Sequence, residues 1–95
     1  MLTQAGLTAI EELGSGAVFC QLLLKAHPKA IQQHRINYQA TTTYEFTNNF
    51  RLLQNAFTEL GIERPLDVEA LARAQYRDNF ELAVWFYWYI DGQQP

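Results

Sequence analysis

The 95-residue sequence contains a single cysteine and no long uninterrupted apolar run. One cysteine excludes an intrachain disulfide, so the chain is not a small secreted domain held together by disulfides. Cys20 stands in the apolar run Ala-Val-Phe-Cys-Gln-Leu-Leu-Leu, where we expect a buried packing role. No apolar run approaches the ~18 residues that a membrane span needs, and the first residues lack the basic-then-apolar order of a signal peptide. We therefore expect a reducing, cytoplasmic compartment and no membrane partner.

The sequence also lacks the motifs that enzymes and cofactor sites use. It has no glycine-rich phosphate loop, no nucleophile elbow and no acidic calcium-binding loop. His27 and His34 flank a proline and a lysine, without the helical spacing or the nearby cysteine and acidic partners that zinc requires. Asp78 and Glu81 form an i, i+3 carboxylate pair beside Arg77, which is typical of a solvated helix face. We expect no catalytic activity, no metal site and no cofactor.

Carboxylates are missing from one long stretch of the chain. No Asp or Glu lies between Glu12 and Glu45, whereas this window contains Lys25, Lys29, Arg35 and both histidines. The net charge of −3 is mild and gives no indication of a nucleic-acid partner. Three cations spread over this stretch are also what ordinary solvated surface would contain. Composition alone therefore assigns them no function.

Hydrophobic spacing predicts helices along the whole chain. An apolar fraction of 48% and a charged fraction of 18% describe one folded domain over residues 1–95. We expect helices over residues 2–13, 17–26, 44–60, 68–74 and 76–90. The stretch 29–43 reads as a loop with at most one turn of helix, in which Ile31, Ile36 and Tyr38 are scattered apolar anchors. Because no alternating strand pattern occurs, the fold class is all-α, with about five helices.

Several helix ends carry capping residues. Ser15, the threonines at 41–43 and Asp67 each precede a predicted helix as N-cap candidates, and Gly61 stands where a C-cap belongs. The long helix between them has apolar residues at steps of four and three, which is typical of an amphipathic helix. These apolar residues are Phe46, Phe50, Leu53, Phe57 and Leu60.

The last predicted helix is the most aromatic part of the chain. Seven of the thirteen aromatic residues lie between Tyr76 and Ile90, and the second half of this helix has no polar face. Such a helix is either buried on nearly all sides or offers a face to a partner. We expect burial, with the rest of the domain wrapped around this helix. Its main apolar stripe consists of Tyr76, Phe80, Val84 and Trp88.

Four segments resemble one known family in their order and spacing. They are Leu-Thr-Ala-Ile-Glu-Glu-Leu-Gly-Ser-Gly-Ala-Val-Phe-Cys-Gln-Leu at 7–22, Ile-Asn-Tyr-Gln-Ala at 36–40, the helix from Tyr-Glu-Phe to Phe at 44–57, and Tyr-Arg-Asp-Asn-Phe-Glu at 76–81 with Trp-Phe at 85–86. This pattern resembles a calponin-homology domain, and more narrowly the N-terminal domain of the end-binding (EB) family of microtubule plus-end tracking proteins. The resemblance implies a helical domain of the cytoplasmic microtubule cytoskeleton. Such domains bind the microtubule lattice at the junction between protofilaments and have no hydrolytic activity.

The resemblance also implies which residues contact the microtubule. Paired lysines of the family correspond to His34 and Arg35, and a third lysine falls on Thr41, so one cation is missing. A lysine after the long helix corresponds to Arg64, and a glutamine of the family falls on Arg77, which adds a charge. Histidine in place of lysine makes one further charge depend on pH. Because the surface of tubulin is acidic, such cations hold the domain in a salt-dependent way.

Two departures from the family pattern stand out. The first helix of the family, which carries its own tryptophan, has no counterpart in residues 1–6. Tyr87 and Trp88 stand where the family has lysines, and they predict an aromatic patch for self-association or another partner. The alternative to lattice binding is therefore a calponin-homology-like structural or interaction domain of a cytoskeletal assembly, without tip tracking. Actin binding by a lone domain ranks third.

Overall fold

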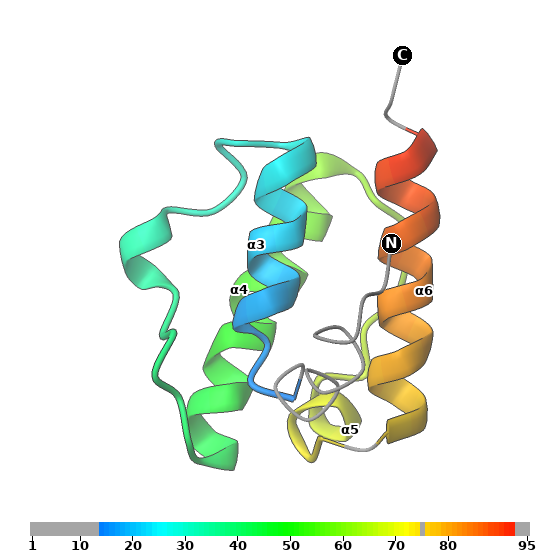
Figure 1. The fold of residues 1–95 in the computed structure, drawn as a ribbon. Helices are drawn as coiled ribbons and strands as arrows, with labels where there is room; N and C mark the ends of the chain where they lie inside the picture. The colour runs from blue at the N-terminus through cyan, green and yellow to red at the C-terminus, as the bar shows by residue number, and fades with distance from the viewer. Residues whose placement is uncertain (1–13, 75, 93–95) are drawn as a thin grey trace.

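The computed structural model describes residues 14–74 and 76–92, and every regular element within these ranges is a helix. The elements are α3 (Ala17–Ala26), the 3₁₀ turn η1 (Gln33–Arg35), α4 (Thr43–Leu60), α5 (Val68–Ala72) and α6 (Tyr76–Gly92). Both α3 and α5 contact α4 and also α6, and α5 lies at the end of the molecule where α6 begins (Figure 1). The expected all-α class is confirmed. The helix expected over residues 2–13 lies outside the described residues.

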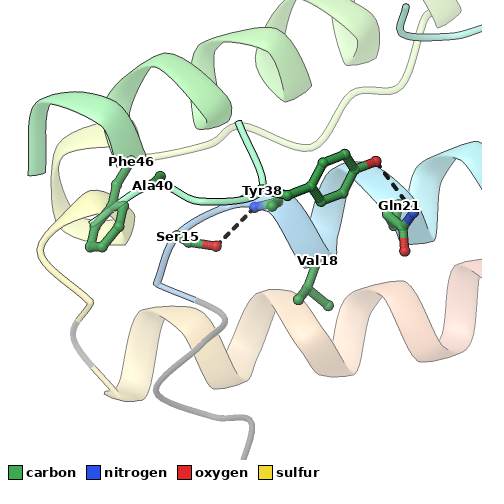
Figure 2. Close-up of a pocket in the computed structure, with 7 residues that line it drawn as sticks. Ser15, Val18, Gln21, Tyr38, Ala40 and Phe46 are labelled. Carbon is green, nitrogen blue, oxygen red and sulfur yellow. Dashed lines mark hydrogen bonds between the residues drawn. The ribbon is translucent and has the colours of Figure 1, made fainter. Parts of the chain in front are cut away.

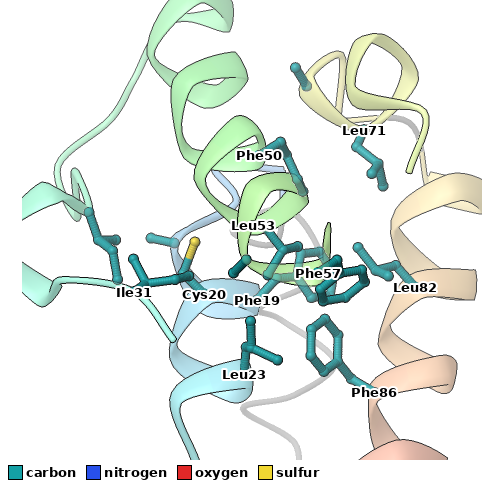
Figure 3. Packing of buried hydrophobic residues seen from close by; sticks show 14 residues of the cluster. Phe19, Cys20, Leu23, Ile31, Phe50, Leu53, Phe57, Leu71, Leu82 and Phe86 are labelled. Atoms are coloured by element: carbon teal, nitrogen blue, oxygen red, sulfur yellow. The ribbon is translucent and has the colours of Figure 1, made fainter. Parts of the chain in front are cut away.

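Four phenylalanines from three helices form the centre of the core. The ring of Phe19 in α3 lies 6.0 Å from that of Phe50 in α4 and 5.7 Å from that of Phe86 in α6, measured between centroids. Phe57 of α4 completes the group, 5.9 Å from Phe86, and Figure 3 shows these rings gathered between the helices. All four side chains are at most 2% exposed. Because each such ring contributes roughly 2–3 kcal/mol by burial, this cluster sets how the three long helices meet.

The predicted apolar stripe of α4 is confirmed at its centre and wrong at its end. Phe50, Leu53 and Phe57 are buried, whereas Leu60 in the last turn is 38% exposed. The predicted packing role of Cys20 is confirmed, since its side chain is fully buried. Burial raises the pKa of this thiol to about 12, so it stays protonated at neutral pH.

Local capping interactions explain where α4 begins and ends. The Thr42 side chain accepts a hydrogen bond from the Glu45 N–H at 3.1 Å, while the Glu45 carboxylate accepts one from the Thr42 N–H at 3.2 Å. This is a reciprocal capping box. Gly61 ends the helix with φ of 73°, a left-handed conformation that glycine adopts without steric cost. Both predicted caps of this helix are confirmed.

The predicted cap of α3 is wrong by one residue. Gly16 occupies the N-cap position with φ of 83°, and the Ser15 hydroxyl instead accepts a hydrogen bond from the Ala17 N–H at 3.2 Å. A Cβ at Gly16 would approach the Asn49 Cβ to 3.0 Å. Only glycine therefore combines this backbone conformation with the close approach of α4.

Near the other end of the chain, Asp67 caps α5 as expected, with its carboxylate accepting from the Ala70 N–H at 3.2 Å. The helix ends at Ala72, two residues earlier than predicted, because Ala74 turns the chain with φ of 60°.

The expectation that α6 is buried on nearly all sides is wrong. Its buried line consists of Asn79, Leu82 and Phe86, all at most 1% exposed. The predicted stripe of Tyr76, Phe80, Val84 and Trp88 forms the outward face instead, with exposures from 37% to 65%. Hydrophobic periodicity could not separate the two faces, because both are apolar over most of the helix.

A buried amide ties three parts of the fold together. Asn49 is 1% exposed, and its side-chain N–H₂ donates to the Ser15 carbonyl at 2.8 Å and to the Asn37 carbonyl at 3.0 Å. Its side-chain oxygen accepts from the Asn37 N–H at 3.0 Å. The partners fix the orientation of the amide, since only nitrogen can donate to the two carbonyls. Asn49 thus joins α4 to the start of α3 and to the segment that follows η1.

We expect Asn49→Asp to destabilise the domain by ~3 kcal/mol, because a carboxylate would face two carbonyl oxygens without a proton to donate. The thermal midpoint should fall by roughly 12–24 °C for a domain of this size. Asn48→Asp, at the neighbouring exposed position of α4, should change stability by less than ~0.5 kcal/mol. Urea unfolding of both variants measures the difference. Equal midpoints for the two variants would contradict the role given to Asn49.

Candidate functional site

Two buried isoleucines hold the segment that carries His34 and Arg35. Ile31 is 8% exposed and Ile36 is 5% exposed, while residues 32–35 between them lie at the surface. The turn η1 is closed by the Arg35 N–H donating to the Gln32 carbonyl at 2.9 Å. Of the three expected anchors in this stretch, both isoleucines are confirmed, whereas Tyr38 is half exposed. The two side chains are therefore displayed on an anchored turn.

The cations around this turn form no ion pair with any described residue. We call residues 25–35 the cationic segment; its charged or titratable residues are Lys25, His27, Lys29, His34 and Arg35. Within the described ranges the ion pairs are Arg73 with Glu69 at 3.2 Å and Arg77 with Glu81 at 3.3 Å. Lys25, Lys29 and Arg35 are exposed and take part in neither. Their positive charge is available to an anionic surface.

Thr41, the third candidate, stands beside a carboxylate. Its backbone N–H donates to the Glu45 carboxylate at 2.8 Å, and its side chain is exposed. The backbone N–H groups of Thr41 and Thr42 hold the pKa of the Glu45 carboxyl below its usual value, so this group is ionised at neutral pH. The local charge at this position is negative.

Arg64 is held against the core and is not a free surface cation. The side chain is half-buried in the connection between α4 and α5, and its guanidinium carbon lies 5.9 Å from the centroid of the Trp85 ring. It also donates a hydrogen bond to the Pro65 carbonyl at 3.3 Å. Trp85 in turn packs on Phe57, with 5.2 Å between ring centroids. Arg64 therefore covers the edge of the core through a cation–π contact and displays only part of its charge.

The five predicted contact residues do not form one cluster. His34 and Arg35 are neighbours on η1, whereas Arg77 lies in the first turn of α6 and pairs with Glu81. Figure 1 shows η1 and α6 on opposite sides of α3 and α4. The structure thus brings the first pair together and places Arg77 well apart from it.

A pocket of about 410 Å³ opens between the start of α3 and the chain from Tyr38 to Phe46 (Figure 2). Its wall is mostly apolar and uncharged, with a hydrogen bond from the Gln21 amide to the Tyr38 hydroxyl at 3.3 Å. The Ser15 hydroxyl at its edge accepts from the Ala17 N–H, and no His, Asp, Glu or Lys is among the described residues that line the pocket. Such a lining offers no convergent acid, base and nucleophile.

No group of His, Cys, Asp or Glu side chains that could hold a metal ion occurs in the described part of the chain. None of its helices is long and apolar enough to cross a membrane.

Two important polar residues escaped the reasoning from sequence. Asn49 lies one position before Phe50 and three after Phe46, which places a polar side chain on the apolar face of a helix. This position is the sequence feature that could have indicated a buried, hydrogen-bonded amide. His27 forms a hydrogen bond of 2.6 Å with the Tyr89 hydroxyl and so joins the end of α3 to α6. Nothing in the local sequence indicates that contact, because the two residues are 62 positions apart.

Comparison with known proteins agrees with this fold. The profile of the calponin homology (CH) domain matches residues 7–91. Microtubule-associated protein RP/EB family member 1C of Arabidopsis thaliana is 36% identical over 88 residues, which are 93% of this chain and 27% of that protein. The chain thus spans about a quarter of the length of this relative. A chain from a structure described as "Structural Basis of Microtubule Plus End Tracking by XMAP215, CLIP-170 and EB1" matches with a TM-score of 0.80 and 35% identity. That match covers 84% of this chain and 68% of the other. The resemblance expected from the sequence is confirmed, and the chain belongs to the calponin homology domain family, with similarity to its EB members.

Proposed function

We propose that this domain is the microtubule-binding module of an EB-type protein and that it docks on the acidic tubulin lattice through the cationic segment. The observation that carries this proposal is the exposed charge of Lys25, Lys29 and Arg35, which form no ion pair with the described residues. Arg35 lies on the anchored turn η1. No carboxylate lies between Glu12 and Glu45 to neutralise this charge locally. The similarity to a protein named as microtubule-associated supports the same partner. The function is binding, without catalysis, in the microtubule cytoskeleton.

Electrostatics determines the character of such binding. An exposed ion pair contributes ~0.2–1 kcal/mol, so the few cations of the segment must act together to hold the domain. At an ionic strength of 0.15 M the Debye length is ~8 Å, which weakens attraction between exposed charges. Binding should therefore be fast, reversible and sensitive to salt. Arg64 lies over Trp85 and the charge of Arg77 is partly satisfied by Glu81, so both display less free charge than the cationic segment.

A second candidate function is that of a structural or interaction module in a cytoskeletal assembly, without tip tracking. The exposed aromatic face of α6, with Tyr87 at 53% and Trp88 at 65% exposure, favours this candidate. A domain whose partner binds that face would not depend on the cationic segment. Substitutions therefore distinguish the two candidate functions: changes in the cationic segment should weaken lattice binding, whereas changes on the α6 face should weaken binding of the other partner.

We expect Arg35→Glu to weaken pelleting with stabilised microtubules about fivefold, or ~1 kcal/mol, because it replaces an attraction to acidic tubulin by a repulsion. Arg51→Glu is the matched control, since Arg51 is an exposed arginine of α4 outside the segment and the net charge changes equally. Co-sedimentation at low and at physiological salt measures both, and wild-type binding should weaken as salt rises. Arg64 is a poorer choice for this test, because its loss would also uncover Trp85. Equal weakening by both variants, or no pelleting even at low salt, would contradict lattice binding through this segment.

Thr41→Lys should tighten binding by ~0.5 kcal/mol, or about twofold, by adding one exposed cation beside the segment. The substitution leaves the capping box intact, because Thr41 contributes only its backbone N–H to Glu45. The midpoint of a co-sedimentation titration at low salt reports the change. Thr58→Lys, at an exposed position near the far end of α4, controls for net charge alone. Unchanged or weaker binding of Thr41→Lys would place this position outside the contact surface.

A further inference from the structure

The outer face of α6 carries a continuous apolar surface that the proposed function does not use. We call it the α6 stripe; it comprises Tyr76 (63% exposed), Phe80 (37%), Val84 (37%), Tyr87 (53%) and Trp88 (65%). Its rings contact one another, with Tyr76 stacked on Phe80 at 5.6 Å and Tyr87 edge-on to Trp88 at 5.4 Å between centroids. Exposed aromatic clusters of this kind mark interaction surfaces.

The charges along this face have an ordered arrangement. Arg77, Val84 and Asp91 are all exposed and follow one another at steps of seven residues, so they lie nearly on one line along the helix. Arg77 marks one end of the line and Asp91 the other. Phe80 and Trp88 lie four residues before and after Val84, on either side of the line. The face is therefore apolar at its centre, with the Arg77–Glu81 ion pair at one end and the Asp91 carboxylate at the other.

We propose that the α6 stripe binds the α6 stripe of a second copy of this chain, with the two helices antiparallel about a two-fold axis at Val84. In this arrangement residues equally far before and after Val84 face each other across the axis. Arg77 of one copy meets Asp91 of the other about 10 Å from the axis, given 1.5 Å of rise per residue. Phe80 of one copy likewise meets Trp88 of the other. Every contact occurs twice.

Charge disfavours the parallel arrangement of the same two surfaces. Parallel helices in register would place Asp91 against Asp91, so that these carboxylates repel, and would place the two Arg77–Glu81 pairs against each other. The antiparallel arrangement instead brings each Asp91 to the Arg77 of the other copy. Arg77 also keeps its own Glu81 within 3.3 Å, so the partner's Asp91 joins an existing pair at the rim.

The available area sets the expected strength. Aromatic side chains present ~150–250 Å² each, so the exposed fractions leave on the order of 500 Å² of apolar surface on each copy. Two copies together bury roughly 1,000 Å², the lower limit for a specific interface. An interface of this small size is typical of a weak, reversible dimer. Because η1 and α6 lie on opposite sides of the molecule (Figure 1), such a dimer displays both η1 turns, with His34 and Arg35, outward.

Sedimentation velocity of the whole chain, from low micromolar to about 0.5 mM, tests the proposal. We expect a reversible monomer–dimer equilibrium, and a dissociation constant at least tenfold higher for Val84→Glu, which would bring two carboxylates together at the axis. Tyr44→Glu is the matched control, since Tyr44 is 76% exposed on α4 and outside the stripe. It should leave the equilibrium unchanged. A chain that stays monomeric throughout, or equal effects of both variants, would overturn the proposal.

A charge exchange tests the antiparallel register itself. Arg77→Asp and Asp91→Arg should each weaken the dimer severalfold, because each creates like-charged contacts at both ends. The double variant restores the opposite charges and should recover most of the wild-type affinity, with circular dichroism confirming that each variant keeps its helix content. If the double variant lost as much dimer affinity as the two single variants together, this antiparallel register would be excluded. That holds whatever partner the face binds.

Disulfide trapping gives a second readout that does not depend on affinity. Val84→Cys should form a covalent dimer on mild oxidation, since two copies meet at this residue. The native Cys20 is buried and its pKa is raised to about 12, so it does not compete. Arg51→Cys on α4 should cross-link much more slowly. Equal rates at the two positions would mean random collision and would contradict the two-fold contact.

Discussion

The side-chain amide of Asn49 is the interaction on which the arrangement of the domain depends. Three backbone groups, from Ser15 and Asn37, are satisfied by this one buried side chain. Without it, two carbonyls and one N–H would lose their partners in a partly buried site, at a cost of up to ~1–3 kcal/mol each. Gly16 belongs to the same arrangement, because its missing Cβ lets α3 approach Asn49. Asparagine and glycine at these positions are required by geometry.

The functional surfaces follow from that anchoring. Asn37 comes directly after the buried Ile36, so the amide of Asn49 and the isoleucine together fix the end of the turn that displays Arg35. A charge on an anchored turn loses less conformational entropy on binding than one on a free loop. On the opposite side, α6 gives its line of Asn79, Leu82 and Phe86 to the core and leaves an aromatic face outside. One small core thus supports a cationic surface and an apolar surface that face in different directions.

Sequence reasoning succeeded where one local rule decides the outcome. The capping threonines, the period of α4 and Gly61 fixed its boundaries to within a residue, because capping and periodicity act locally. It failed where tertiary contacts decide. Hydrophobicity could not tell which side of α6 is buried, since both sides are apolar, and no local pattern indicates that Arg64 covers Trp85. For the candidate site, the role given to His34 and Arg35 by resemblance stays a prediction, and the structure adds that both are exposed on η1. The pairing of Arg77 with Glu81 follows the i, i+4 rule for helix surfaces and could have been predicted from their spacing.

The most direct test of the central role of Asn49 is amide hydrogen exchange at Asn37, whose N–H donates to the Asn49 side chain at 3.0 Å. If the amide of Asn49 holds this segment to α4, the Asn37 N–H should exchange only through global unfolding, as slowly as the core amides around Leu53. The Asn37 residue itself is exposed, so burial of its side chain cannot account for such protection. Exchange of this N–H as fast as that of unprotected surface amides would contradict the account, because the turn carrying Arg35 would then open independently of the core.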